Sequence, residues 1–259
     1  LDSKFGFPLD TGQAKEAVQK AMAAPNLDLK GIHFHLGSPI FEVEPYVEAI
    51  GRVLSFASEM REEGLQMTEF SPGGGFAIAY TEEDQPPTQG DYAKAIVDAL
   101  KEGCADHGLP EPQLIIEPGR SVTGPAGVAL YTVGAIKVVS GVRTFVAVDG
   151  GMGDNIRPAL YEAKYEAVAA TRMNEEASAT YTVAGKYCES GDILVEEASL
   201  PPLRVGDIIA MPAAGAYSPS MASNYNENPR PPIVLVKDGV TRIIRRRETA
   251  EDLMRTDVW

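Results

Sequence analysis

The first half of the chain alternates between two hydrophobic patterns. Apolar residues recur every three or four positions, as in amphipathic helices, in three segments: 10–24, 44–63 and 92–107. Between these segments lie short apolar runs that predict strands: 29–37, 67–70 and 114–117. Strands that alternate with helices predict a parallel sheet with its chemistry at the carboxyl ends of the strands.

Two of these segments also predict where individual side chains point. The helix 44–63 has one apolar face, formed by Tyr46, Val47, Ile50, Val53, Leu54, Ala57 and Met60. Side chains of the first strand alternate, which places on one side Ile32, Phe34 and Leu36 and on the other His33 and His35.

After about residue 127 the pattern changes to short strands separated by turns rich in Gly, Pro, Asn and Asp. The strand-like runs are 128–139, 144–148, 165–171, 180–183, 208–211, 233–236 and 242–244. We therefore expect two domains, an α/β part at 1–127 and a mostly β domain at 128–259.

Composition narrows the class of protein. The formal net charge of −14 argues against a nucleic-acid partner, and the basic run at 245–247 is expected at a solvated strand end. No apolar run approaches the ~18 residues that a membrane-spanning helix needs, and the start does not resemble a signal peptide. The first residue is not Met, which is weak evidence for a processed or truncated chain. Cys104 and Cys188 do not make a disulfide framework, and no glycosylation sequon occurs, so we expect a cytoplasmic location.

Polar groups follow the predicted strands in three places. His33 and His35 have three interpretations: metal ligands, core histidines, or a ring stacked on a planar cofactor. Glycines at 73–75 either let backbone N–H groups approach an anion or form a plain tight turn. Glu117 and Arg120 either form a structural ion pair or act on a ligand, the carboxylate on a heterocyclic nitrogen and the guanidinium on an anionic group.

The β half also concentrates polar groups in glycine-rich turns. These segments are 149–152, 157–161, 188–192, 216–217 and 221–226. Each alone is ordinary turn chemistry, but this density is unusual for a plain β scaffold.

Taken in this order, the segments resemble the fold-type III pyridoxal phosphate (PLP) decarboxylases, the group built like alanine racemase. The motifs are Glu-Pro-Gly-Arg at 117–120, Arg-Pro-Ala-Leu-Tyr at 157–161 and Cys-Glu-Ser-Gly-Asp at 188–192. The resemblance runs over nearly the whole chain and is greatest to members that convert meso-2,6-diaminopimelate to L-lysine and CO₂. It implies that the first half is the C-terminal part of a PLP-binding (β/α)8 TIM-type barrel.

The resemblance implies a set of cofactor-binding residues: His35, Ser38, Gly75, Glu117, Gly119, Arg120 and Tyr217. In this set His35 stacks on the pyridine ring, and Glu117 pairs with the ring nitrogen and keeps it protonated.

It also implies residues that bind a diamino dicarboxylic acid substrate: Arg120, Arg157, Tyr161, Glu189 and Tyr217. The two arginines would bind the distal carboxylate and Glu189 the distal ammonium group, although Arg157 and Glu189 could instead form a structural pair. Cys188 resembles the proton donor. In the family, Cys188 and Glu189 are donated across a dimer interface, so the resemblance implies a homodimer. It implies no metal.

One element of the family pattern is missing. The family binds its cofactor through a lysine in a Tyr-Ala-x-Lys-Ala segment on an early barrel strand, and nothing here matches at that place. Lys94 follows a Tyr-Ala pair but is expected on a helix surface. The alternating region is also about half of a complete ~250-residue barrel. We therefore expect a fragment of a longer protein that is inactive and poorly stable alone.

Two alternatives stay open. One is a related decarboxylase of the carboxynorspermidine or ornithine type, although ornithine-type members carry Cys-Asp where this chain has Cys188 and Glu189. The other is a non-catalytic relative that acts as a binding module, which the missing lysine favours and the retained thiol opposes.

Overall fold

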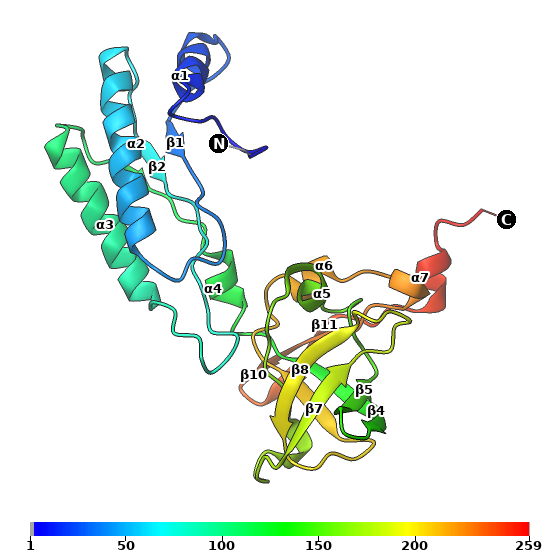
Figure 1. Ribbon diagram of the computed structural model, residues 1–259. Helices are drawn as coiled ribbons and strands as arrows, with labels where there is room; N and C mark the ends of the chain where they lie inside the picture. Colours follow the sequence, from blue (N-terminus) through cyan, green and yellow to red (C-terminus); the bar gives the residue numbers. More distant parts are fainter. Residues whose placement is uncertain (1–2, 259) are drawn as a thin grey trace. The chain divides into compact units, whose positions relative to one another are not determined.

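The computed structural model describes residues 3–258 and divides into two compact units (Figure 1). The first contains the chain up to Ile78 and Gln85–Ser121, and the second contains Ala79–Asp84 and the chain from Val122 onward. The chain therefore passes from one unit to the other three times. None of the helices within residues 3–258 is long and apolar enough to cross a membrane.

The first unit alternates strands and helices. Its elements are α1 (Gln13–Ala23), β1 (Gly31–His33), α2 (Glu44–Glu62), β2 (Glu69–Ser71), α3 (Gln89–Asp106), β3 (Gln113–Leu114) and the start of α4 (Gly119–Thr123). The strands pair in parallel in the order β1-β2-β3, as the alternating pattern predicts. Two isolated parallel bridges extend the pairing beyond the strands, Ile40 with Phe76 and Gly74 with Glu117.

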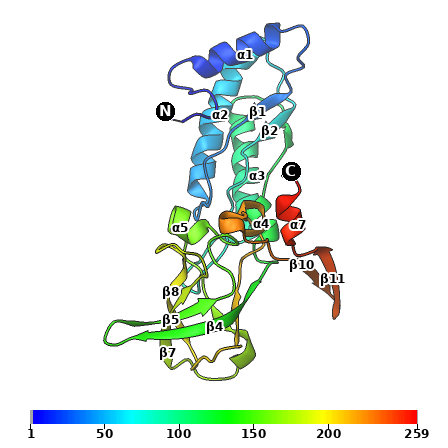
Figure 2. The same ribbon diagram turned by 90° about the vertical axis from the view of Figure 1, so that its right-hand side faces the viewer.

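The helices α2 and α3 lie side by side against the sheet (Figures 1 and 2) and enclose the core of this unit. The aromatic rings at its centre pack closely, with Phe76 stacked on Tyr92 at 4.6 Å and Tyr46 edge-on to both. The predicted apolar face of α2 is buried except for Val47, which is 44% exposed. Cys104 lies in this core, on the inner face of α3.

A local signal fixes the start of α3. Thr88 forms a capping box: its hydroxyl accepts from the amide of Asp91, and the Asp91 carboxylate accepts from the amide of Thr88. Lys94 lies on the exposed face of this helix and forms an ion pair with Asp98, as expected for a helix-surface residue.

The second unit is mostly β. A six-stranded sheet has the order β6-β9-β4-β5-β7-β8, and a separate hairpin pairs β10 with β11. The strands are β4 (Ala129–Val139), β5 (Arg143–Val148), β6 (Val168–Ala169), β7 (Ala179–Ala184), β8 (Ile193–Leu200), β9 (Ile208–Met211), β10 (Ile233–Lys237) and β11 (Val240–Arg245). Only β5 and β7 pair in parallel within the six-stranded sheet.

Several short helices connect or follow these strands: α5 (Arg157–Tyr161), η1 (Ala170–Arg172), α6 (Ser218–Met221), η2 (Tyr225–Glu227) and, after the last strand, α7 (Ala250–Met254). The end of β11 carries the basic run, where Arg246 is exposed and paired with Asp252.

Candidate functional site

Sequence-predicted site residues of the first unit gather at the carboxyl ends of its parallel strands. His35 follows β1, the glycines 73–75 follow β2, and Glu117 follows β3. Because parallel strands end at the same edge of a sheet, three segments distant in sequence meet there. The contacts described below join all of them.

The imidazole of His35 lies against the glycine turn. The amide of Gly74 donates to Nδ1 of His35 at 3.4 Å. A Cβ atom placed on Gly73 would lie 2.7 Å from the same nitrogen, and Gly73 has φ +76°. The absence of a side chain at this position therefore lets the ring of His35 approach the backbone.

The glycine turn also approaches the strand end at Glu117. The amide of Glu117 donates to the carbonyl of Gly73 at 2.9 Å, and Gly74 bridges Glu117 in parallel register. A Cβ atom on Gly74 would lie 2.0 Å from the carbonyl oxygen of Glu117. Only a glycine fits at Gly74, so the turn is built from close backbone packing.

Gly75 continues this close packing toward the segment after β1. It has φ +95°, and a Cβ there would lie 2.2 Å from the carbonyl oxygen of Gly37. The hydroxyl of Tyr46, a core residue, donates to the carbonyl of Gly74 at 2.7 Å. The turn is therefore held by a buried group.

Ser38 and Arg120 are in direct contact. Nε and Nη2 of Arg120 both donate to Oγ of Ser38 at 3.2 Å, and the arginine is buried. The guanidinium is thus held beside the end of the glycine turn, where Ser38 follows Gly37.

The carboxylate of Glu117 remains accessible, with its side chain 57% exposed. Its Oε1 lies 3.8 Å from Nδ1 of His33, whose ring also pairs with the hydroxyl of Ser71 at 2.9 Å. An exposed carboxylate at a strand end is available to a ligand. Within residues 3–258, no group of three or more His, Cys, Asp and Glu side chains is arranged to hold a metal ion.

The second unit holds a second group of predicted residues around Arg157. This arginine begins α5 and is buried, and its Nη1 donates to the hydroxyl of Tyr165 at 2.6 Å. Its Cζ also lies near the ring centroids of Tyr80 at 4.9 Å, Tyr165 at 5.7 Å and Tyr217 at 6.0 Å. Tyrosine rings therefore surround a planar cation, which fixes the guanidinium without neutralising its charge.

Two of these tyrosines were not predicted as site residues. Tyr165 was expected only as part of a strand, and Tyr80 lies in the loop after the glycine turn. No spacing rule links either residue to Arg157, because their contact depends on how the chain folds back. Tyr161 was predicted and is 61% exposed at the end of α5.

Tyr217 has a backbone conformation that is rare for a residue with a side chain. Its φ is +66° at the start of α6. Such strain persists only where surrounding structure enforces it, and it often marks a functional position.

Cys188 and Glu189 lie in an exposed turn before β8. Cys188 is a free, exposed thiol, whereas Cys104 is buried. The hydroxyl of Tyr225 donates to Oε1 of Glu189, and the ring of Tyr225 contacts that of Tyr187 at 5.9 Å. Tyr225 was not predicted as a site residue, and it orients the Glu189 carboxylate.

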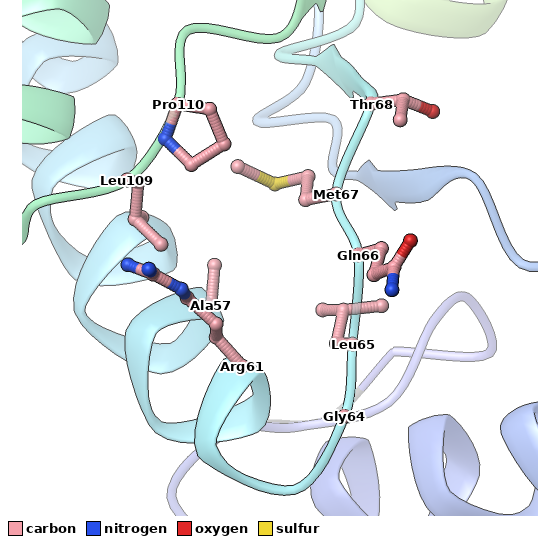
Figure 3. Close-up of a pocket in the computed structure, with 9 residues that line it drawn as sticks. All are labelled: Ala57, Arg61, Gly64, Leu65, Gln66, Met67, Thr68, Leu109 and Pro110. Carbon is pink, nitrogen blue, oxygen red and sulfur yellow. The ribbon is translucent and has the colours of Figure 1, made fainter.

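A pocket of about 460 Å³ lies at the other end of β2 (Figure 3). Its lining is mostly apolar or backbone: Ala57, Arg61, Gly64, Leu65, Gln66, Met67, Thr68, Leu109 and Pro110. Its one charged side chain, Arg61, donates to the carbonyl of Gly108 at 2.6 Å. This pocket lies before β2, whereas the candidate site lies after it, and it contains no acid or base for catalysis.

The chain is similar to known proteins over nearly its whole length. Residues 1–124 match the family described as "Pyridoxal-dependent decarboxylase, pyridoxal binding domain". The chain is 47% identical to the diaminopimelate decarboxylase of Halalkalibacterium halodurans and 46% identical to that of Bacillus subtilis. Each alignment covers 99% of this chain and 59% of the relative, so the chain spans about three fifths of the length of these curated proteins.

Solved structures give the same result. The crystal structure of diaminopimelate decarboxylase from M. jannaschii in complex with L-lysine is 36% identical, with a TM-score of 0.93. The match covers 100% of this chain and 58% of that one. The corresponding Helicobacter pylori enzyme with L-lysine is 35% identical with a TM-score of 0.83, covering 93% of this chain and 58% of that one.

These relatives confirm the predicted fold, part of a PLP-binding barrel followed by a mostly β domain. They also confirm that the chain corresponds to only part of such a decarboxylase. The chain is therefore similar to the pyridoxal-dependent decarboxylases over residues 1–124 and, over almost its whole length, to part of the diaminopimelate decarboxylases.

Proposed function

We propose that this chain is part of an enzyme that decarboxylates meso-2,6-diaminopimelate to L-lysine and CO₂. The observation that carries the proposal is the meeting of His35, the glycine turn at 73–75 and Glu117 at one sheet edge. The names of the relatives support the choice of reaction.

The residues of the first unit fit pyridoxal 5'-phosphate. The turn at 73–75 carries no side chains, so it leaves an edge of bare backbone that a phosphate group can approach closely. Ser38 and Gly119 extend this edge, and Arg120 adds a positive charge beside it. The ring of His35 would cover one face of the cofactor.

Glu117 is suited to hold a proton on the pyridine nitrogen. Its carboxylate is exposed and lies at the end of a strand, so a heterocyclic N–H can reach it. The protonated cofactor supplies an electron sink for the bond that loses CO₂. The role of the carboxylate is to keep that proton in place.

The second unit supplies the groups that fit a substrate with an amino acid head at each end. Arg157 carries a fixed guanidinium that can bind a carboxylate through two hydrogen bonds. Glu189 is oriented by Tyr225 and can accept from an ammonium group. Tyr161 and Tyr217 would complete substrate binding, with Arg120 contributing a second cation.

Cys188 is suited to donate a proton to the carbon that has lost CO₂. Its thiol is exposed, in the same turn as Glu189. We propose that the working enzyme is a homodimer in which Cys188 and Glu189 serve the active site of the partner subunit. Free thiols at both cysteines also agree with a cytoplasmic location, which belongs to this proposal.

The lysine that would bind the cofactor covalently is the missing part. Lys94 is paired with Asp98 on the outer face of α3 and is not available for that role. We therefore propose that the chain alone does not decarboxylate diaminopimelate.

A chimera tests the function directly. The chimera joins this chain to the part of the Bacillus subtilis relative that the chain does not match. Release of CO₂ and lysine from meso-diaminopimelate is then measured. We expect activity from the chimera and none from the chain alone. Arg157→Ala should lower kcat/KM for diaminopimelate by at least about tenfold, because the distal carboxylate loses its main cation.

The same assay separates the alternatives. If the chimera prefers ornithine or another diamino monoacid, and Arg157→Ala has no effect, that acid replaces diaminopimelate as the substrate. A chimera that binds the cofactor and acts on none of these acids would indicate a non-catalytic binding module. Activity of the chain alone, with cofactor reducible by borohydride, would refute the fragment interpretation.

A further inference from the structure

The carboxylate of Asp192 connects two turns of the second unit. Asp192 is 3% exposed and ends the Cys-Glu-Ser-Gly-Asp segment. Its Oδ1 accepts from the amide of Met152 at 2.6 Å, and its Oδ2 accepts from the amide of Tyr187 at 2.8 Å. One donor lies in the turn after β5, and the other directly precedes Cys188.

Two glycines make room for this carboxylate. A Cβ atom on Gly185 would lie 2.1 Å from Oδ2 of Asp192, and one on Gly151 would lie 2.5 Å from Oδ1. Neither position admits a side chain while the carboxylate stays in place. The backbone around Asp192 is therefore shaped to enclose a carboxylate.

The backbone of the same residue closes the turn at its base. The amide of Gly185 donates to the carbonyl of Asp192 at 2.8 Å, and the amide of Asp192 donates to the carbonyl of Glu189 at 3.1 Å. The amide of Lys186 also donates to the carbonyl of Gly150 at 2.9 Å. The turn is thus held at both ends, and its exposed part is the segment that contains Cys188 and Glu189.

Burial disfavours the ionised form of the Asp192 carboxyl. Burial raises the pKa of the Asp192 carboxyl, and the two backbone hydrogen bonds offset that rise only in part. Burying an ionised carboxylate costs free energy. This cost is offset where the carboxylate fixes a geometry that an apolar residue could not.

We propose that Asp192 is a positioning residue that fixes the turn presenting Cys188 and Glu189. It acts by binding the amides of Met152 and Tyr187 at once. The chemical purpose of the presented thiol rests on the proposed function, whereas the anchoring of the turn is independent of it.

Asp192→Asn tests this anchoring in the full chain. The amide side chain has one acceptor oxygen and places an NH₂ group against the second backbone N–H. We expect hydrogen–deuterium exchange of segments 150–153 and 186–189 to become at least about tenfold faster, since a hydrogen bond to a charged acceptor is lost. The thiol of Cys188 should react at least about twofold faster with a disulfide reagent, while exchange in β4 and β5 stays unchanged.

Asp154→Asn is the matched control. Asp154 is also a partly buried carboxylate in this region, and its Oδ2 accepts from the amide of Gly151 at 3.0 Å. An Asn oxygen can still accept that single bond, so exchange at 186–189 and the reactivity of Cys188 should not change.

A second pair of variants approaches the same contact from the other side. Gly185→Ala should displace the carboxylate and reproduce the Asp192→Asn pattern, whereas Gly191→Ala should not, because a Cβ there meets nothing within 4 Å. If Asp192→Asn fails to fold, this pair decides the question.

The proposal is overturned if both Asp192→Asn and Gly185→Ala leave exchange at 186–189 unchanged. It is also overturned if they speed exchange equally in β4 and β5, which would mean a general role in stability. If Asp192→Asn speeds local exchange but the chimera is inactive, the anchoring proposal stands and only the proposed function is refuted. Unchanged exchange in an active chimera would refute only the anchoring.

Discussion

The guanidinium of Arg157 donates a hydrogen bond to the hydroxyl of Tyr165 inside the second unit, at 2.6 Å. Both residues are buried, so neither can replace this bond with water at no cost. Arg157 is thereby fixed before any ligand arrives.

Tyr165→Phe is expected to lower the free energy of unfolding by about 1–3 kcal/mol, because it leaves a buried N–H without its acceptor. Urea unfolding of the chain measures this change. The matched control is Tyr161→Phe, whose exposed hydroxyl should matter by less than about 0.5 kcal/mol. Equal effects of the two substitutions would contradict the prediction.

Gly74→Ala is expected to destabilise the first unit by about 1–3 kcal/mol and to abolish binding of pyridoxal phosphate. Its Cβ would lie 2.0 Å from the carbonyl of Glu117, so the backbone of the turn must move. Gly51→Ala, on the exposed face of α2, should instead stabilise the chain by about 0.5–1 kcal/mol. Urea unfolding and cofactor absorbance distinguish the two, and a neutral Gly74→Ala would be evidence against the close approach.

Glu248 and Arg230 should give a pH-dependent contribution to stability. Hydrogen bonds from Arg230 lower the pKa of the Glu248 carboxyl to about 2. Because this pKa is depressed in the folded state, the stabilisation is complete above about pH 4.5 and is lost as pH falls through about 2.

Glu248→Gln is therefore expected to cost about 1 kcal/mol at pH 7, the usual size for a partly exposed pair, and less at pH 3. Unfolding in urea at the two pH values measures the difference. Glu176→Gln, at an exposed carboxylate, should show no such dependence. A cost that grows toward pH 3 would reverse the sign and refute the assignment.

The two thiols should differ in reactivity. Cys104 is in the core, where burial raises the pKa of its thiol, whereas Cys188 is exposed. We expect one thiol per chain to react rapidly with a disulfide reagent under native conditions, and two after denaturation. Cys188→Ser should remove the rapid phase, and its persistence would place the reactive thiol elsewhere.

Hydrophobic patterns predicted most of the longer elements. The helices α1, α2 and α3 and the strands β4, β5, β7 and β9 lie within a few residues of their expected positions. Val47 was predicted on the apolar face of α2 but is exposed, because it lies at the edge of that face, beyond the reach of the core.

Other elements were missed or overestimated for local reasons. The strand expected at 29–37 shortens to β1, and the run at 165–171 to β6, because the chain leaves the sheet once no neighbouring strand pairs with it. β8 was missed, although Leu194, Ala198 and Leu200 point inward at even spacing, because Glu196 and Glu197 break its apolar run. The short helices α4 to α7 are too brief to produce a periodic signal.

The sequence motifs named the strand-end groups but not what supports them. His35, Gly75 and Glu117 were proposed because the motifs that contain them resemble those of a known family, whereas Tyr46, Tyr80 and Tyr165 belong to no such motif. Supporting contacts of this kind join residues far apart in sequence, and only the folded chain reveals them.

The segment Ala79–Asp84 belongs to the second unit although it is flanked on both sides by the first. It carries Tyr80, which packs edge-on against Tyr165 and under the guanidinium of Arg157. A β fragment that begins at residue 122 would therefore lack Tyr80, one of the tyrosines that pack against Arg157. Production of the second unit on its own therefore requires that the six residues Ala79–Asp84 be supplied as well.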